Sequence, residues 1–136
     1  LGDVYKRQTP YINKSLQYLL KNDFKAFKNK NSFFAMTGHL IFNQIDKDNT
    51  VTHSRKMINI IRKKVGFKNL LISDDLSMKS LKKGLKINTI DTFKAGCNLA
   101  LHCNGKLKEM EIVGKNSPLI SKFVIKKTSQ FYNILR

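Results

Sequence analysis

Side chains that could carry out chemistry follow three short apolar runs of this 136-residue chain. The groups are Thr37 and His39 after Phe33–Met36, Ser73 to Asp75 after Leu70–Ile72, and His102 with Asn104 after Leu99–Leu101. A carboxylate such as that of Asp74 can act as a nucleophile, and an imidazole such as that of His39 can transfer protons. If the runs are parallel strands, these groups meet at the carboxyl edge of one sheet, where such folds bind ligands. We then expect His39 and Asp74 to open onto one shared cleft.

Several of these residues also have a purely structural explanation. A single histidine such as His39 is often a hydrogen-bonded structural side chain, and Asp75 could cap a helix that follows it. Cys97, His102 and Cys103 resemble metal ligands, but a structural zinc site needs a second ligand pair at a defined spacing. We therefore expect two buried thiols, no disulfide scaffold and no metal at these positions.

The segments between the apolar runs have helical periodicity, so helices and strands alternate along the chain. The strands are apolar without alternation, which is typical of strands covered on both faces in a parallel sheet. The expected helices start at Thr9-Pro10, at Ser54 with a stop at Gly66, at Ser77 with a stop at Gly84, at Asn88 with a stop at Gly96, at Lys106 before Gly114, and at Ser117-Pro118 running toward Leu135. This order predicts an α/β fold.

The chain is strongly basic, with 26 Lys and Arg against nine Asp and Glu and a formal net charge of +17. Such an excess raises the alternative of a small basic nucleic-acid-binding domain. Only four of the 26 cations are Arg, the residue that recognises phosphate and guanine with paired hydrogen bonds. The lysines are scattered along the chain, so we interpret the charge as compositional and expect no nucleic-acid partner.

The apolar content of the chain predicts its location in the cell, and its first residues predict where the domain begins. No apolar run approaches the ~20 residues that a membrane helix needs, so the sequence predicts a soluble, cytoplasmic protein without a membrane partner. Residues 1–8 fit no periodic pattern and resemble a translated cloning adapter, so we expect the domain to occupy residues 9–136. The sequence does not indicate the oligomeric state.

Several segments, in the same order, make the chain resemble the bacterial beta-N-acetylhexosaminidases of glycoside hydrolase family 3. The similar segments are A-M-T-G-H at 35–39 (M-T-A-H in the family), G-F at 66–67 with S-D-D-L-S-M at 73–78 (G-F-x-G-x-x-x-S-D-D-L-S-M), A-G-C-N at 95–98 with C-N at 103–104 (A-G-C-D and C-N), and S-P at 117–118. The chain departs from the family at Gly38, which replaces Ala, at Asn69, which replaces Gly, and at Asn98, which replaces Asp.

The resemblance implies an incomplete (β/α)8 barrel of TIM type, of which this chain supplies about the last three βα units. It implies a retaining exo-glycosidase that releases terminal N-acetylglucosamine from peptidoglycan-derived muropeptides during cell-wall recycling, without metal or cofactor. It makes Asp74 the nucleophile that forms a covalent glycosyl-enzyme, and it makes His39 and Met78 residues that line the substrate pocket.

The resemblance also implies that the acid/base residues, which act together with the nucleophile in the family, are missing from this chain. The family's acid/base residues lie in a K-H-F-P-G-H-G segment and a D-S-H loop, and neither occurs in this chain. His39, His53 and His102 do not follow an Asp-Ser pair. In the family the D-S-H loop lies just before the helix expected at Thr9-Pro10. We therefore expect a fragment that carries its nucleophile without its acid/base residue and is inactive alone.

Overall fold

A computed structural model describes residues 9–28 and 30–136, and the adapter expected at residues 1–8 lies outside them. Helices alternate with short parallel strands, which confirms the predicted α/β class. The strands are β1 (Tyr11–Ile12), β2 (Phe34–Met36), β3 (Ile41–Phe42), β4 (Leu70–Asp75) and β5 (Leu99–Leu101). The helices are α2 (Leu16–Lys21), α3 (Arg55–Ile60), α4 (Leu85–Ala95), α5 (Leu107–Asn116) and α6 (Lys122–Ile134), with single 3₁₀ or π turns at Phe24–Phe27, Val51–His53 and Ile61–Val65.

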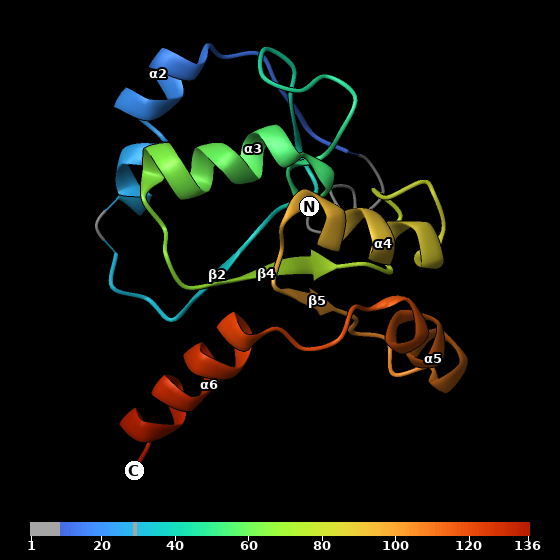
Figure 1. Ribbon diagram of the computed structural model, residues 1–136. Coiled ribbons are helices and arrows are strands. Elements are labelled where there is room, and N and C mark those ends of the chain that lie inside the picture. Colours follow the sequence, from blue (N-terminus) through green and yellow to red (C-terminus); the bar gives the residue numbers. More distant parts are fainter. Residues whose placement is uncertain (1–8, 29) are drawn as a thin grey trace.

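The three predicted strands form one parallel sheet with the order β2-β4-β5. Phe34 pairs with Leu70 and Ile72 pairs with Leu99, so the carboxyl ends of the strands lie along one edge. In Figure 1 the arrows of β4 and β5 point the same way. A separate parallel pair, β1 and β3, was not expected from the sequence. Among the described residues, β2 and β5 each have only β4 as a neighbour.

Both faces of the central strand β4 are covered. Leu70 and Leu71 are 0% and 1% exposed, and successive strand residues point to opposite faces. Leu71 packs with Ile58 of α3, and α3 and α4 lie on that side of the sheet in Figure 1. On the other side, the ring of Phe131 from α6 meets that of Phe34, the strand neighbour of Leu70, at a centroid distance of 5.1 Å. Cover on this side is partial, since Met36 at the end of β2 is 59% exposed and only Val124 of α6 is buried, so the prediction of a sheet covered on both faces holds for the start of β4.

The helices that follow β3 and β4 end where the sequence predicts. The side chain of Ser54 caps α3 by accepting a hydrogen bond from the N–H of Met57 at 3.1 Å. The chain after α3 stops at Gly66 and α4 stops at Gly96, both in left-handed conformations with φ of 85° and 116°. A Cβ at Gly96 would also lie 3.1 Å from the side chain of Ile58, so α3 and α4 approach closely at this point.

The first helix begins later than predicted. Ser15, not Thr9, caps α2, since its side chain accepts from the N–H of Tyr18 at 3.2 Å. The residues after Thr9-Pro10 form β1 instead, because the carbonyl of Pro10 accepts from the N–H of Ile41 at 2.9 Å. A long-range strand pairing has therefore overridden a helix-start signal of local origin.

The predicted helix over Ser77–Lys83 is wrong, because this segment forms consecutive turns. Its first turn is set by the carboxylate of Asp75, which accepts from the N–H of Ser77 at 3.0 Å. Further along, the carbonyl of Ser80 accepts from the hydroxyl of Thr9 at 2.8 Å, so the segment is tied to the start of the described chain. Side-chain bonds of this kind compete with helical hydrogen bonds.

The last two helices also differ from the prediction in their bounds. Helix α5 continues through Gly114 to Asn116. Helix α6 begins after Ser121 rather than at Ser117-Pro118, and the side chain of Ser121 accepts from the N–H of Val124 at 3.2 Å. Two serines four residues apart both suit a helix start, and the one that forms a cap bond to the backbone begins the helix.

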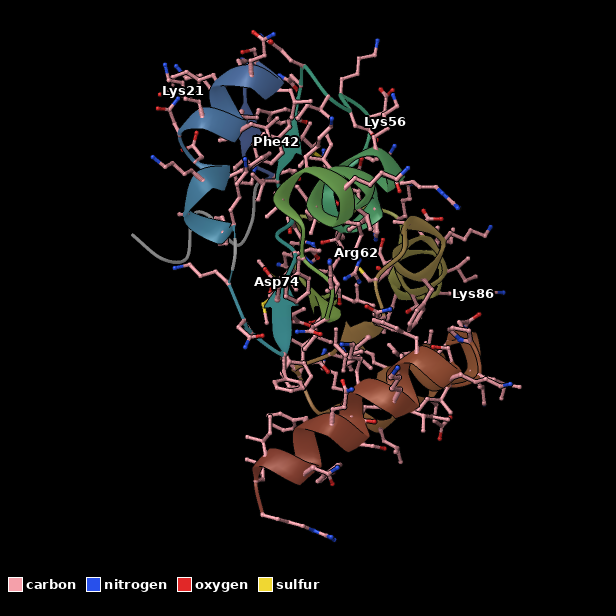
Figure 2. All side chains as sticks on the ribbon, turned by 60° about the vertical axis from the view of Figure 1, so that its left-hand side comes forward. Lys21, Phe42, Lys56, Arg62, Asp74 and Lys86 are labelled. Atoms are coloured by element: carbon pink, nitrogen blue, oxygen red, sulfur yellow. The ribbon has the colours of Figure 1, made fainter. Side chains whose placement is uncertain are left out.

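The positive charge is spread over the surface. Figure 2 shows Lys21, Lys56 and Lys86 on separate parts of the molecule, from α2, α3 and α4. This spread fits the compositional interpretation of the charge. No helix within residues 9–28 and 30–136 is long and apolar enough to cross a membrane.

We predict that acid destabilises the fold through His53. Burial lowers the pKa of His53 to about 4, and its Nε2 bonds to the carbonyl of Asn88 at 3.1 Å. As the pH falls, His53 is therefore protonated at a higher pH in the unfolded chain than in the folded chain. The free energy of unfolding decreases as the pH falls from about 6.5 to about 4. His53→Gln keeps a donor without titrating. Between about pH 6.5 and about pH 4, we expect the free energy of unfolding of His53→Gln, measured by urea titration, to decrease by about 1–2 kcal/mol less than that of the wild-type chain. Equal losses in the two proteins would contradict the prediction.

Candidate active site

Asp74 lies at the carboxyl end of β4, on the edge where the sequence analysis expects the site. Its side chain is half-buried, and its Oδ1 accepts a hydrogen bond from the backbone N–H of Asp75 at 2.8 Å. The pairing of β4 with β5 shifts register between Ile72 and Asp75, an irregularity that re-aims side chains at the end of a strand. The buried hydroxyl of Ser73 accepts from the N–H of Leu101 at 2.9 Å across this shift. Backbone geometry therefore sets the direction of the Asp74 carboxylate, which is labelled in Figure 2.

Asp75 organises the turn that follows. Its carboxylate accepts from the N–H and the hydroxyl of Ser77, at 3.0 and 2.7 Å, and from the N–H of Cys103 at 3.2 Å. Burial raises the pKa of Asp75, but these hydrogen bonds outweigh burial and hold the pKa below its ordinary value. Asp75 therefore stays ionised and joins the ends of β4 and β5. It caps a turn rather than the helix considered from the sequence.

His39 lies behind this turn rather than in solvent. It is 5% exposed, its Nε2 lies 2.9 Å from the carbonyl oxygen of Asp75, and its Nδ1 lies 2.9 Å from the hydroxyl of Thr52. Burial lowers the pKa of His39, although the nearby carboxylates of Asp74 and Asp75 oppose this effect. Both ring nitrogens are used within the protein, so only ring carbons are left for the expected contact with a sugar. That contact stays a prediction.

The other polar residues expected at the edge lie around Asp75. Met78 is half-buried in the turn, and its N–H donates to the carbonyl of Asp75 at 3.1 Å. The side chain of His102 is 6% exposed and lies 3.8 Å from Asp75 and 3.5 Å from Glu109, measured from ring nitrogen to carboxylate oxygen. Among the described residues neither ring nitrogen of His102 has a hydrogen-bond partner. A contact of Met78 with substrate stays a prediction.

The expected shared cleft between His39 and Asp74 is not formed, because His39 is buried beneath the turn. A cavity of about 440 Å³ lies nearby, but it is lined mainly by apolar side chains, among them those of β2 and of the turns Phe24–Phe27 and Ile61–Val65, and Asp74 is not among the lining residues. The mouth of a barrel is enclosed by loops from eight strands. In the described part of the chain, the three strands of this sheet supply an edge with the carboxylate of Asp74 on it.

The cysteines are structural or exposed rather than paired. Cys97 is buried, and burial raises the pKa of its thiol to about 11, so it stays protonated and unreactive. Cys103 is exposed, so the expectation of two buried thiols is correct for one of them. Within the described part of the chain, no group of three or more His, Cys, Asp or Glu is placed to hold a metal ion.

Two polar residues with structural roles carry no sequence signal, Thr52 beneath the site and Arg62 at the amino-terminal ends of β4 and β5. Thr52 is 0% exposed and its hydroxyl contacts both His39 and Thr37, the latter at 2.9 Å. Arg62 donates to the side-chain oxygen of Asn98 at 2.6 Å, and the backbone N–H of Leu71 donates to the same oxygen at 2.9 Å. An amide oxygen is therefore sufficient here, where the family has a carboxylate. Only the packing of distant segments reveals these roles.

The whole sequence was compared with models of known protein families, and the match agrees with a carboxylate at the end of a parallel strand. The Glycosyl hydrolase family 3 N terminal domain matches residues 5–127. The chain belongs to this family.

Relatives in sequence and in structure agree with the assignment. Beta-hexosaminidases of Haemophilus influenzae and Psychromonas ingrahamii are 31% and 28% identical in alignments 105 and 131 residues long, and these alignments cover 71% and 92% of this chain. The structure of CbsA from Thermotoga neapolitana superposes on 96% of the chain with a TM-score of 0.75 at 23% identity, covering 33% of CbsA. That of native NagZ from Neisseria gonorrhoeae superposes on 88% with a TM-score of 0.72 at 24% identity, covering 34% of NagZ.

The chain is shorter than the members of the family that it resembles. The alignments cover 29% of the Haemophilus influenzae protein and 37% of the Psychromonas ingrahamii protein. The chain therefore spans about a third of the length of these relatives.

Proposed function

We propose that this chain forms the C-terminal part of the catalytic barrel of a retaining beta-N-acetylhexosaminidase, with about the last three βα units of that barrel. The parallel order β2-β4-β5 and the helices between the strands support this proposal, because successive βα units of a barrel have this connectivity. The share of the relatives that the chain covers also fits three units of eight. The remaining strands, and the acid/base residue, would come from the portion of the enzyme outside this chain.

The observation that carries the proposal is the carboxylate of Asp74 at the carboxyl end of β4. Its Oδ1 accepts a hydrogen bond from the N–H of Asp75, which fixes the direction of the carboxylate. A retaining glycosidase needs an ionised carboxylate below the anomeric carbon. In the first step, an oxygen of Asp74 forms a bond to that carbon while the glycosidic bond breaks, and an acid from outside the chain protonates the leaving oxygen. Water then cleaves the glycosyl ester and releases Asp74.

The substrate would be a peptidoglycan-derived muropeptide with a terminal N-acetylglucosamine. The enzyme would release this sugar during cell-wall recycling in the cytoplasm, and the reaction would need no metal ion. The relatives carry the name beta-hexosaminidase, which supports the sugar class. The alternative, a nucleic-acid-binding domain, would require cations gathered on one face, whereas Lys21, Lys56 and Lys86 lie apart.

A covalent trap tests this proposal in the parent enzyme, meaning the product of the complete reading frame that contains this chain. A 5-fluoro N-acetylglucosaminyl fluoride has a leaving group that needs little acid assistance, and its ring fluorine slows hydrolysis of the glycosyl ester. We expect mass spectrometry to find the sugar on the peptide that contains Asp74.

The stereochemistry of hydrolysis is an independent readout. Two displacements at the anomeric carbon retain its configuration, so NMR should detect the β-anomer of N-acetylglucosamine as the first product. A first product with the α configuration, or a sugar attached to any residue other than Asp74, would contradict the proposed mechanism. A parent enzyme that does not hydrolyse N-acetylglucosaminides would contradict the proposed function as a whole.

A further inference from the structure

His39 joins three segments that are distant in sequence. Its Nε2 contacts the carbonyl oxygen of Asp75 at the end of β4, and its Nδ1 contacts the hydroxyl of Thr52, both at 2.9 Å. The hydroxyl of Thr52 in turn lies 2.9 Å from that of Thr37, at the end of β2. His39 is 5% exposed, so these contacts are shielded from water. The same ring therefore connects the ends of two neighbouring strands.

The direction of each hydrogen bond follows from the chemistry of its partners. A carbonyl oxygen can only accept, so Nε2 of His39 carries a proton and donates it to Asp75. Burial lowers the pKa of His39, so the ring is neutral and Nδ1 accepts from the hydroxyl of Thr52. The hydroxyl of Thr52 has one proton, which faces Nδ1 of His39 at 2.9 Å and the carbonyl oxygen of Gly38 at 3.3 Å, and its oxygen accepts from the hydroxyl of Thr37. The chain of hydrogen bonds thus fixes a single tautomer of His39.

The carbonyl that receives this proton belongs to the residue that directs Asp74. The carbonyl oxygen of Asp75 also accepts from the N–H of Met78, and the Asp75 carboxylate is held by Ser77 and Cys103. With its carbonyl and side chain fixed, Asp75 has one remaining backbone donor, its N–H, which binds Oδ1 of Asp74 at 2.8 Å. The carbonyl and the N–H of Asp75 flank the same Cα atom, so a shift of the Asp75 backbone would move the donor that aims the carboxylate.

We propose that His39 is a positioning residue, which aims the nucleophilic carboxylate of Asp74 by holding the backbone of Asp75. The inference rests on the proposed role of Asp74. It differs from a sugar contact by His39 because it predicts a loss in the rate of attack and none in the affinity for the sugar. Misplacing a reacting group by about 1 Å can cost about 100-fold in rate.

Substitutions at His39 in the parent enzyme separate the two roles. His39→Leu fills the space without a donor, and we expect kcat/KM for a chromogenic N-acetylglucosaminide to fall about 10- to 100-fold. His39→Gln keeps an N–H donor near the position of Nε2, and we expect it to recover at least part of the loss. The inhibition constant for N-acetylglucosamine should stay within about twofold in both variants, because the positioning role involves no contact between His39 and the sugar.

A control uses the half-buried His53, which also donates to a backbone carbonyl. His53 bonds to Asn88 of α4 rather than to Asp75, so His53→Leu should lower stability while leaving kcat/KM near the wild-type value. Asp74→Asn controls for the proposed function. If Asp74→Asn stays active, the proposed function fails. If Asp74→Asn is inactive while His39→Leu keeps its kcat/KM, or loses affinity for N-acetylglucosamine instead, the positioning role alone fails.

A spectroscopic readout tests the same inference without activity. We expect nitrogen-15 NMR of the wild-type chain to show the Nε2–H tautomer of His39 at neutral pH. Thr52→Val removes the donor to Nδ1, and the tautomer should then become mixed or the ring more readily protonated. A wild-type signal from the Nδ1–H tautomer would overturn the proposal, even if every variant at position 39 failed to fold.

Discussion

Asp74→Ala should abolish turnover in the parent enzyme, with a loss in kcat on the order of 10⁴-fold or more. The size of this effect follows from the chemistry of a retaining glycosidase, in which the carboxylate forms the bond that replaces the glycosidic bond. Alanine leaves no atom that can attack, while the sugar-binding residues stay in place. We expect KM or the inhibition constant for N-acetylglucosamine to change little by comparison. The measurement is the hydrolysis of a chromogenic N-acetylglucosaminide.

Two companion measurements make the result specific to Asp74. Azide can enter the space left by the side chain, so it should restore part of the activity of Asp74→Ala and give a glycosyl azide of the α configuration. Asp91→Asn removes a carboxylate that pairs with Lys83 at 2.9 Å, outside the site, and should leave turnover unchanged. Turnover by Asp74→Ala close to that of wild type, without azide, would refute the nucleophile assignment.

The second large effect is expected for the 136-residue chain alone, which should show no measurable hydrolysis of the same substrate. No described group is placed to protonate the leaving oxygen, since His39 uses both ring nitrogens within the protein and the side chain of His102 is only 6% exposed. General acid catalysis contributes about 10²–10⁴-fold. The sugar would also lack the barrel wall that positions it, and positioning contributes a further large factor.

Open strand edges add a physical consequence for the isolated chain. In the described sheet, β2 and β5 each pair only with β4, and unpaired edges favour association between copies. We therefore expect self-association that increases with concentration, measured by sedimentation. The parent enzyme, assayed at the same molar concentration, is the control for the absence of activity. Robust turnover by the chain alone would refute the proposal that its acid/base residue lies elsewhere.

Much of this architecture was predictable from short segments. Leu70 and Leu71 are adjacent, apolar and both buried, and a strand with no alternation is the local signature of a sheet covered on both sides. Gly66 and Gly96 mark helix ends because their left-handed conformations disfavour other residues. The S-D-D-L-S-M segment placed Asp74 at a strand end, and β4 ends there. These features depend on the conformational preferences of a few neighbouring residues, which a sequence displays directly.

Other features depend on contacts between residues far apart in the chain, and only the tertiary structure decides them. The local signal of Thr9-Pro10 favoured a helix, but the bond from Ile41 to Pro10 made a strand. The environment of His39 is likewise decided by Thr52 and by the Asp75 carbonyl, which lie 13 and 36 residues away. A sequence predicts which groups stand at the end of a strand. Which of them face solvent and which are bonded beneath the turn depends on the packing of separate segments, because burial and hydrogen-bond partners are properties of the assembled fold.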